Sequence, residues 1–277
     1  MLTRKIANLA TRSVRYFDVG AGRPMLLLHA FPLSADQWLP QLTRVAPGWR
    51  AIAPDHRGFH GTGPAFGMSD EPVTMETYAA DALELLAHLG VERTAVAGLS
   101  MGGYVAMALA RLAPQRLDAL VLADTRATAD TEEGRAGRDR MIDLAQREGA
   151  AGVAREMLPK LLGETTHRHQ PDLAHVIQHV IEQNPPAGIV AGLQAMKSRP
   201  DSFEMLTALS CPVTIICGDE DRLTPVADSE AMHRAMPGST LVVLPRAGHL
   251  SNLEAPDGFT AALYAVASAP AERVARA

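Results

Sequence analysis

Cysteine is scarce in this chain of 277 residues, which contains only Cys211 and Cys217. Both fall in one apolar run that we expect to form a strand. Six strand steps separate them by about 20 Å, whereas a disulfide needs Cα atoms within about 7 Å. The two cysteines therefore cannot pair with each other while that strand is formed. Nothing in the cysteine content requires an oxidising compartment.

Long hydrophobic runs and a strong charge of one sign are also missing. No window approaches the roughly 18 uninterrupted apolar residues of a membrane span, and the first twenty residues lack a secretory apolar stretch. The net charge of −5 gives no reason to expect a nucleic-acid partner or an anionic membrane surface. These features predict a cytoplasmic protein with neither nucleic acid nor membrane as a partner. A homo-oligomer is compatible with them.

Short apolar runs alternate with helical patterns over much of the chain. The predicted strands are residues 25–29, 50–54, 94–99, 117–123, 213–217 and 241–244, and residues 75–89 and 102–112 are predicted helices. Strands that alternate with helices indicate a largely parallel sheet. Because the strands are almost continuously apolar, we expect helices on both faces of this sheet.

The middle of the chain breaks this rhythm. Residues 125–200 contain no convincing strand pattern, and helices are predicted at 132–146, 153–162, 171–183 and 188–197. A helical insert in a parallel sheet is expected to cover the edge where such sheets bind ligands. We therefore predict a core domain of residues 1–124 and 201–277 and a helical lid of residues 125–200. A helical subdomain that only supports the core is the alternative.

One candidate nucleophile follows a predicted strand. The segment GLSMG at residues 98–102 fits G-x-S-x-G and leads into a predicted helix. The turn in this motif is so tight that side chains at the two flanking glycines would clash. The helix N-terminus would also face the reaction centre, where it favours developing negative charge. Ser100 is therefore the predicted nucleophile.

At this motif the chain resembles the α/β-hydrolase superfamily, and the resemblance extends from about residue 25 to residue 259. It implies the α/β-hydrolase fold: a mostly parallel central sheet flanked by helices, with a helical lid inserted. It also implies a catalytic triad in the chain order serine, acid, histidine.

The resemblance extends to the base and the acid. The segment LPRAGHL at residues 244–250 resembles the family's histidine loop, which implies that His249 is the base. The segment GDEDRLTP at residues 218–225 resembles G-x-x-D-x-x-T-P, which implies that Asp221 is the acid. Asp124 is a second candidate, because some members place the acid after the strand that precedes it. Asp219 and Glu220 are expected to serve the loop's structure.

The segment HAFP at residues 29–32 resembles the family's His-Gly-x-Pro oxyanion loop, with Ala30 where glycine is usual. This resemblance implies an oxyanion hole made by the backbone N–H groups of Phe31 and Met101, and a structural role for His29. The segment DHRG at residues 55–58 resembles the family's D-x-R-G turn, whereas residues 59–63 depart from the expected G-x-G-x-S.

The function that the resemblance implies is a serine hydrolase, without metal or cofactor. Its expected substrates are carboxylic esters of small to medium apolar groups, cleaved through an acyl-enzyme. The candidate pocket residues are Met157, Leu161, Ile189 and Met196; alternatively they form only the lid's own core. Two histidine pairs, at 167 and 169 and at 175 and 179, have metal-binding spacing but lack an acidic or cysteine partner nearby.

Other activities use the same triad. The segments at residues 29–32, 98–103 and 247–252 also resemble 3-oxoadipate enol-lactonases, which favours a lactone as the second substrate class. The segment LSADQW at residues 33–38 resembles cofactor-free haloperoxidases (perhydrolases), and carbon–carbon bond hydrolases share the machinery. A non-hydrolytic ligand-binding protein is the alternative from a different class, and a complete triad argues against it. Epoxide and haloalkane hydrolases have aspartate as the nucleophile, so serine at position 100 argues against these two classes.

Overall fold

The computed structural model describes residues 2–10, 12–60 and 72–266. Of the segment at 59–63 that departs from the family's G-x-G-x-S pattern, residues 61–63 lie outside the described ranges. An eight-stranded sheet with the order β1-β2-β4-β3-β5-β6-β7-β8 runs through the molecule. Its strands are β1 (Lys5–Asn8), β2 (Ser13–Gly20), β3 (Arg23–Leu28), β4 (Trp49–Pro54), β5 (Thr94–Leu99), β6 (Leu117–Ala123), β7 (Val213–Gly218) and β8 (Thr240–Leu244). From β4 to β8 every neighbouring pair is parallel, which confirms the predicted fold class.

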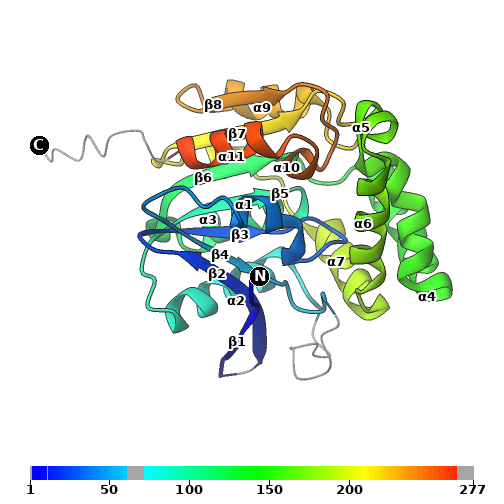
Figure 1. Cartoon of the computed structure of the whole chain (residues 1–277), viewed down its shortest axis with the longest axis horizontal. Coiled ribbons are helices and arrows are strands. Elements are labelled where there is room, and N and C mark those ends of the chain that lie inside the picture. Colours follow the sequence, from blue (N-terminus) through cyan, green and yellow to red (C-terminus); the bar gives the residue numbers. More distant parts are fainter. Residues whose placement is uncertain (1, 11, 61–71, 267–277) are drawn as a thin grey trace, which may run out of the picture.

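Helices cover both faces of the sheet (Figure 1). They are η1 (Ala35–Trp38), α1 (Leu39–Leu42), α2 (Met75–His88), α3 (Met101–Leu112), η3 (Pro114–Arg116), α4 (Glu132–Leu161), α5 (Glu164–His169), α6 (Pro171–Glu182), α7 (Pro186–Ser198), α8 (Phe203–Thr207), α9 (Val226–Ala235), α10 (Ser251–Glu254) and α11 (Pro256–Ala265). Helices α2, α3 and α9 contribute to one hydrophobic core, and α1 and α11 contribute to the other.

The central strand β3 shows why these runs form a sheet that is buried on both faces. Leu26 and Leu28 point into one core, and Met25 and Leu27 point into the other, because successive side chains of a strand alternate. All four are fully buried. Each such burial stabilises the fold by about 1.5–3 kcal/mol. The carboxyl ends of the parallel strands are thereby held rigidly beside one another.

The structure adds two strands that the sequence analysis did not predict. Strands β1 and β2 pair with each other antiparallel, and β2 pairs antiparallel with β4. In β2, buried Val14 and Tyr16 alternate with the half-buried Ser13 and Arg15. A strand near the sheet edge lacks the continuous apolar run of the central strands, and its pattern is therefore weaker.

Helices α4–α7 form the insert between β6 and β7, and they stack at one end of the sheet (Figure 1). Residues 125–200 are all described and contain no strand. The two helices predicted at 132–146 and 153–162 are the halves of α4, which bends at Gly149. Gly149 has a φ of 65°, a conformation that glycine adopts without a steric penalty.

Within the described ranges, no helix combines the length and apolar content that crossing a membrane requires. The same residues contain no group of three or more histidine, cysteine, aspartate or glutamate side chains arranged to hold a metal ion.

Candidate active site

The turn between β5 and α3 lifts Ser100 out of the sheet. Ser100 has a φ of 55°, which is rare for a residue with a side chain. A Cβ on Gly98 would overlap the carbonyl oxygen of Gly102, and a Cβ on Gly102 would overlap the carbonyl oxygen of Leu28. Both glycines of the predicted motif are therefore required by close backbone approaches.

Hydrogen bonds to the neighbouring strand hold this turn in place. The Ser100 N–H donates to the Ala123 carbonyl at 2.9 Å, and the Ser100 carbonyl accepts from Thr125 Oγ1 at 2.9 Å. These bonds fix the backbone on both sides of the Ser100 side chain. The strained conformation is thus maintained by the surrounding fold.

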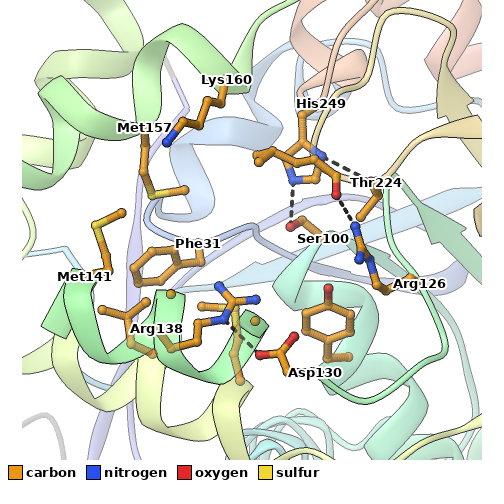
Figure 2. A pocket seen from close by; sticks show the side chains of 16 residues that line it. Phe31, Ser100, Arg126, Asp130, Arg138, Met141, Met157, Lys160, Thr224 and His249 are labelled. Atoms are coloured by element: carbon orange, nitrogen blue, oxygen red, sulfur yellow. Dashed lines mark hydrogen bonds and ion pairs between the residues drawn. The ribbon is translucent and has the colours of Figure 1, made fainter. Parts of the chain in front are cut away.

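The structure brings together the three residues predicted as a triad, although they come from distant parts of the chain. The His249 Nε2 atom lies 2.8 Å from Ser100 Oγ, and His249 Nδ1 lies 2.8 Å from Asp221 Oδ2 (Figure 2 labels His249 and Ser100). If Nδ1 carries its proton toward the carboxylate, Nε2 is free to accept the hydroxyl proton of Ser100. This arrangement suits nucleophilic attack by the serine oxygen.

The Asp221 carboxylate is stabilised by a dense set of donors. Its Oδ1 accepts the N–H groups of Leu223 at 2.8 Å and Thr224 at 3.0 Å, and its Oδ2 accepts Thr224 Oγ1 at 2.6 Å. Burial raises the pKa of Asp221, but the charge of His249 and these hydrogen bonds outweigh it and lower the pKa below its ordinary value. Asp221 therefore stays ionised at neutral pH.

The rival acids make other contacts. Asp124 accepts the Gly218 N–H at 2.9 Å and Ser251 Oγ at 2.5 Å. Burial, and then the charge of Asp221, raise the pKa of Asp124 well above its ordinary value. Asp219, two residues before Asp221, instead accepts the backbone N–H of Arg246 at 2.6 Å. The hydrogen bonds therefore favour Asp221 as the partner of the base.

The segment that contains Phe31 is organised by a neutral histidine. His29 Nε2 accepts the His56 N–H at 3.0 Å, so its Nδ1–H donates to the Ala30 carbonyl at 2.9 Å. Burial lowers the pKa of His29 well below its ordinary value. Ala30 is not among the residues with positive φ, so alanine introduces no strain where the family usually has glycine. Its N–H donates to Gln37 Oε1 at 2.8 Å.

Two backbone N–H groups beside Ser100 remain available as donors. Among the described residues, no hydrogen bond uses the N–H of Phe31 or of Met101. Met101 is the first residue of α3, where the N–H groups have no partner within the helix. The geometry is compatible with the predicted oxyanion hole.

The segment DHRG at residues 55–58 connects this region to α2. Asp55 Oδ1 accepts the Ala35 N–H at 2.8 Å, and Arg57 Nε donates to Asp81 Oδ2 at 2.6 Å. Both side chains bind to neighbouring elements of the fold. The turn is therefore hydrogen-bonded to the elements on either side of it.

A cavity of about 300 Å³ opens in front of Ser100 and His249. Its apolar lining comes from both the core and the insert: Phe31, Met141, Met157, Leu193, Met196 and Leu223. In Figure 2, Met141, Met157 and Phe31 lie on the left of the cavity and Arg126 lies on the right. The insert therefore forms part of the wall of this cavity.

Two of the four residues predicted to line the pocket do so, namely Met157 and Met196. Leu161 and Ile189 do not line it, which corrects that part of the prediction. Leu161 lies at the end of α4 and is fully buried in one core, and Ile189 is fully buried in the other. Ile189 follows Gly188, which packs so closely on the Gly58 carbonyl that a Cβ would not fit there.

Several polar residues of the cavity wall were missed by sequence reasoning: Tyr104, Arg126, Asp130, Arg138, Lys160 and Thr224. Arg138 shares one face of α4 with Gly134, four residues before it, and Met141, three residues after it, but no sequence signal showed that this face lines the cavity. Arg126 lies just beyond the carboxyl end of β6, where ligands of such sheets bind.

Two carboxylates connect the insert to the loops of the triad. Glu254 accepts the Gly163 N–H at 2.8 Å and the Leu250 N–H at 3.1 Å. Glu220 accepts the Thr165 N–H at 2.7 Å. The start of α5 is therefore hydrogen-bonded both to the residue before Asp221 and to the helix that follows His249.

Comparisons with known proteins agree with this fold. Residues 23–256 match the family described as alpha/beta hydrolase fold. The chain is 38% identical to the solved structure of a thermophilic esterase from Thermogutta terrifontis with malate bound, with a TM-score of 0.88 and coverage of 95% of this chain and 97% of that one. It is 27% identical to 3-oxoadipate enol-lactonase 2 of Acinetobacter baylyi over 89% of each chain. It is 31% identical to a non-heme haloperoxidase of Rhodococcus erythropolis, over 84% of this chain and 88% of the relative.

Proposed function

Because the chain belongs to the alpha/beta hydrolase fold family, we propose that it is a serine hydrolase that cleaves carboxylic esters through an acyl-enzyme. The observation that carries this proposal is the hydrogen-bonded series from Ser100 through His249 to Asp221, with 2.8 Å at each step. This series stands at the mouth of a cavity large enough for a small to medium ester.

In the first half of the reaction, Ser100 Oγ attacks the ester carbonyl carbon while His249 Nε2 takes its proton. Asp221 stabilises the imidazolium that forms. The N–H groups of Phe31 and Met101 bind the oxyanion of the tetrahedral intermediate. The C–O bond to the alcohol then breaks, and His249 returns the proton to the departing oxygen.

In the second half, water replaces the alcohol. His249 takes a proton from this water, whose oxygen attacks the acyl carbon. The bond to Ser100 Oγ breaks, the serine regains its proton from His249, and the carboxylic acid leaves. Each half-reaction returns His249 to its neutral form, and Ser100 regains its proton only at the end of the second.

The helical insert of residues 125–200 acts in this proposal as a lid over the core formed by residues 1–124 and 201–277. Met141, Met157, Leu193 and Met196 come from the insert and line the cavity together with Ser100. An apolar acyl or alcohol group would contact these side chains. The likeness to a solved esterase at 38% identity supports esters as the first substrate class.

A lactonase is the second candidate, favoured by the likeness to an enol-lactonase over 89% of both chains. A lactone is a cyclic ester, so the same attack by Ser100 opens it. The leaving oxygen stays tethered to the acyl group. Only the shape of the cavity distinguishes the two classes.

The test compares wild type with Ser100→Ala on p-nitrophenyl acetate, p-nitrophenyl butyrate and a small lactone. We expect wild type to hydrolyse at least one of them and the variant to lose about 10³-fold or more in kcat. The ester-to-lactone ratio of kcat/KM assigns the class. Full activity in Ser100→Ala would refute the proposal.

A further inference from the structure

Two arginines stand in the wall of the catalytic cavity. Arg138 comes from α4, and Arg126 comes from the segment after β6. Both share this wall with Ser100 and His249 (Figure 2). Guanidinium groups in a mostly apolar enclosure are costly unless an anion or an acceptor meets them.

The carboxylate nearest to Arg138 is shared with a second arginine. Asp130 Oδ2 accepts Arg138 Nε at 3.1 Å, and Asp130 Oδ1 lies 2.8 Å from Arg199 Nη1. Burial raises the pKa of Asp130, but the charges of Arg138 and Arg199 outweigh it and lower the pKa below its ordinary value. Two arginines around one ionised carboxylate leave a single positive charge.

This surplus charge is accessible at Arg138 and not at Arg199. The Arg199 side chain is 4% exposed, donates to the Met196 and Thr128 carbonyls and lies 4.0 Å from the Tyr104 ring centroid. The Arg138 side chain is 25% exposed. In the described part of the chain, its only hydrogen bond is the one from Nε to Asp130, so Nη1 and Nη2 are left for a ligand.

The other cations of the wall each have partners of their own. Arg126 donates to the Leu223 carbonyl, and its Nε lies 3.3 Å from Asp228. Lys160 donates to Glu156 at 2.5 Å and is half exposed. Arg138 is therefore the side chain best placed to bind an anion beside Ser100.

We propose that the substrate of this site is an ester or lactone that carries a carboxylate, and that Arg138 binds this carboxylate while Ser100 attacks the ester carbonyl. This inference rests on the proposed hydrolase function. The parallel N–H groups of a guanidinium fit the two oxygens of a carboxylate. One surplus positive charge matches a carboxylate better than a phosphate, which carries about −1.5 to −2 at neutral pH.

The apolar part of the wall suits the rest of such a molecule. Phe31, Met157 and Met196 would cover the methylene chain between the ester and the carboxylate. The substrate class is thus a half-ester of a dicarboxylic acid or its cyclic equivalent. Arg138 acts as a specificity-determining residue and takes no part in the bond changes.

The test uses two substrates of nearly the same shape: monoethyl glutarate, and ethyl 5-methylhexanoate, in which an isopropyl group replaces the carboxylate. We expect wild type to have a kcat/KM at least tenfold higher on monoethyl glutarate. Arg138→Gln should reduce this preference at least tenfold, mainly through KM, and Arg138→Lys should restore part of it. Arg140→Gln, an exposed arginine two residues further along α4, is the matched control and should leave the preference unchanged.

Binding to the Ser100→Ala protein separates the two proposals. Calorimetry should detect glutarate binding that Arg138→Gln weakens at least tenfold, with inorganic phosphate binding more weakly. If no ester or lactone is hydrolysed, the p-nitrophenyl esters included, but this binding is seen, the hydrolase proposal fails and the anion site stands. Equal kcat/KM on both esters, an unchanged preference in Arg138→Gln, or phosphate binding as tight as glutarate would overturn the carboxylate site.

Discussion

Replacing Asp221 by asparagine is expected to lower kcat by about 10³–10⁴-fold, whereas the same change at Asp124 should cost less than about tenfold. The hydrogen bonds around Asp221 explain the size of the effect. Its Oδ1 accepts two backbone N–H groups, so an amide oxygen has to stay there. The amide NH₂ then faces the His249 Nδ1 atom that Asp221 Oδ2 now contacts.

A donor at that point reverses the roles of the imidazole nitrogens. His249 Nδ1 must accept, and Nε2 must then carry the proton toward Ser100 Oγ, which it can no longer deprotonate. A loss of 10³–10⁴-fold corresponds to about 4–5.5 kcal/mol in the activation barrier.

Asparagine at position 124 meets no such conflict. Its amide oxygen can still accept the Gly218 N–H, and the Ser251 hydroxyl can rotate to accept from the NH₂ group. Steady-state kinetics of both variants on p-nitrophenyl butyrate, with circular dichroism to verify folding, provide the measurement. A folded Asp124→Asn protein that loses more kcat than Asp221→Asn would show that the acid has been assigned to the wrong residue.

Three further outcomes follow from the structure. Gly102→Ala should abolish activity or folding, since its Cβ would overlap the Leu28 carbonyl; near-normal kcat in a soluble variant would contradict the packing of this turn. Thr224→Val should lower the free energy of unfolding by about 1.5–3 kcal/mol, measured by urea titration, because it removes a 2.6 Å hydrogen bond to the charged Asp221; an unchanged free energy would show that this bond does not stabilise the fold. Burial raises the pKa of Asp18, but its arginine and lysine partners outweigh it and lower the pKa, so the stability it contributes is present above about pH 4 and lost as the pH falls. Asp18→Asn should therefore lower Tm more at pH 7 than at pH 3, and an equal shift at both would argue against this pairing.

The six central strands could be predicted from the sequence because both of their faces are buried. Their apolar runs are continuous, and the observed bounds of β3 to β8 lie within two residues of the predicted ones. Strands β1 and β2 were missed, since an edge with one exposed face carries polar residues at alternate positions. The sequence pattern predicted two helices where the structure has the single bent helix α4. The bend lies at Gly149, whose φ of 65° and ψ of −162° are outside the helical region.

The candidate site also has a part that the sequence predicts, the three triad residues, and a part that it does not, the wall of the cavity. Ser100, Asp221 and His249 follow strands of a parallel sheet, so the topology alone brings their loops together. The wall of the cavity depends on how the insert packs on the core. A guanidinium on a helix is normally solvated, and only the tertiary structure turns Arg138 toward Ser100. For the same reason, sequence spacing could not separate Met157 and Met196, which face the cavity, from Leu161 and Ile189, which do not.

The carboxylate of Glu254 has a consequence for protein engineering. It accepts one N–H from the insert, at Gly163, and one from the loop after the histidine, at Leu250. A Cβ at position 163 would come within 2.6 Å of a Glu220 oxygen and 2.9 Å of the Gly248 nitrogen. A chimera that takes its helical insert from a relative must therefore keep a glycine at this junction. Without this glycine, the new insert would displace the loop that carries His249. The chimera would then lose turnover even if every side chain that lines the cavity were kept.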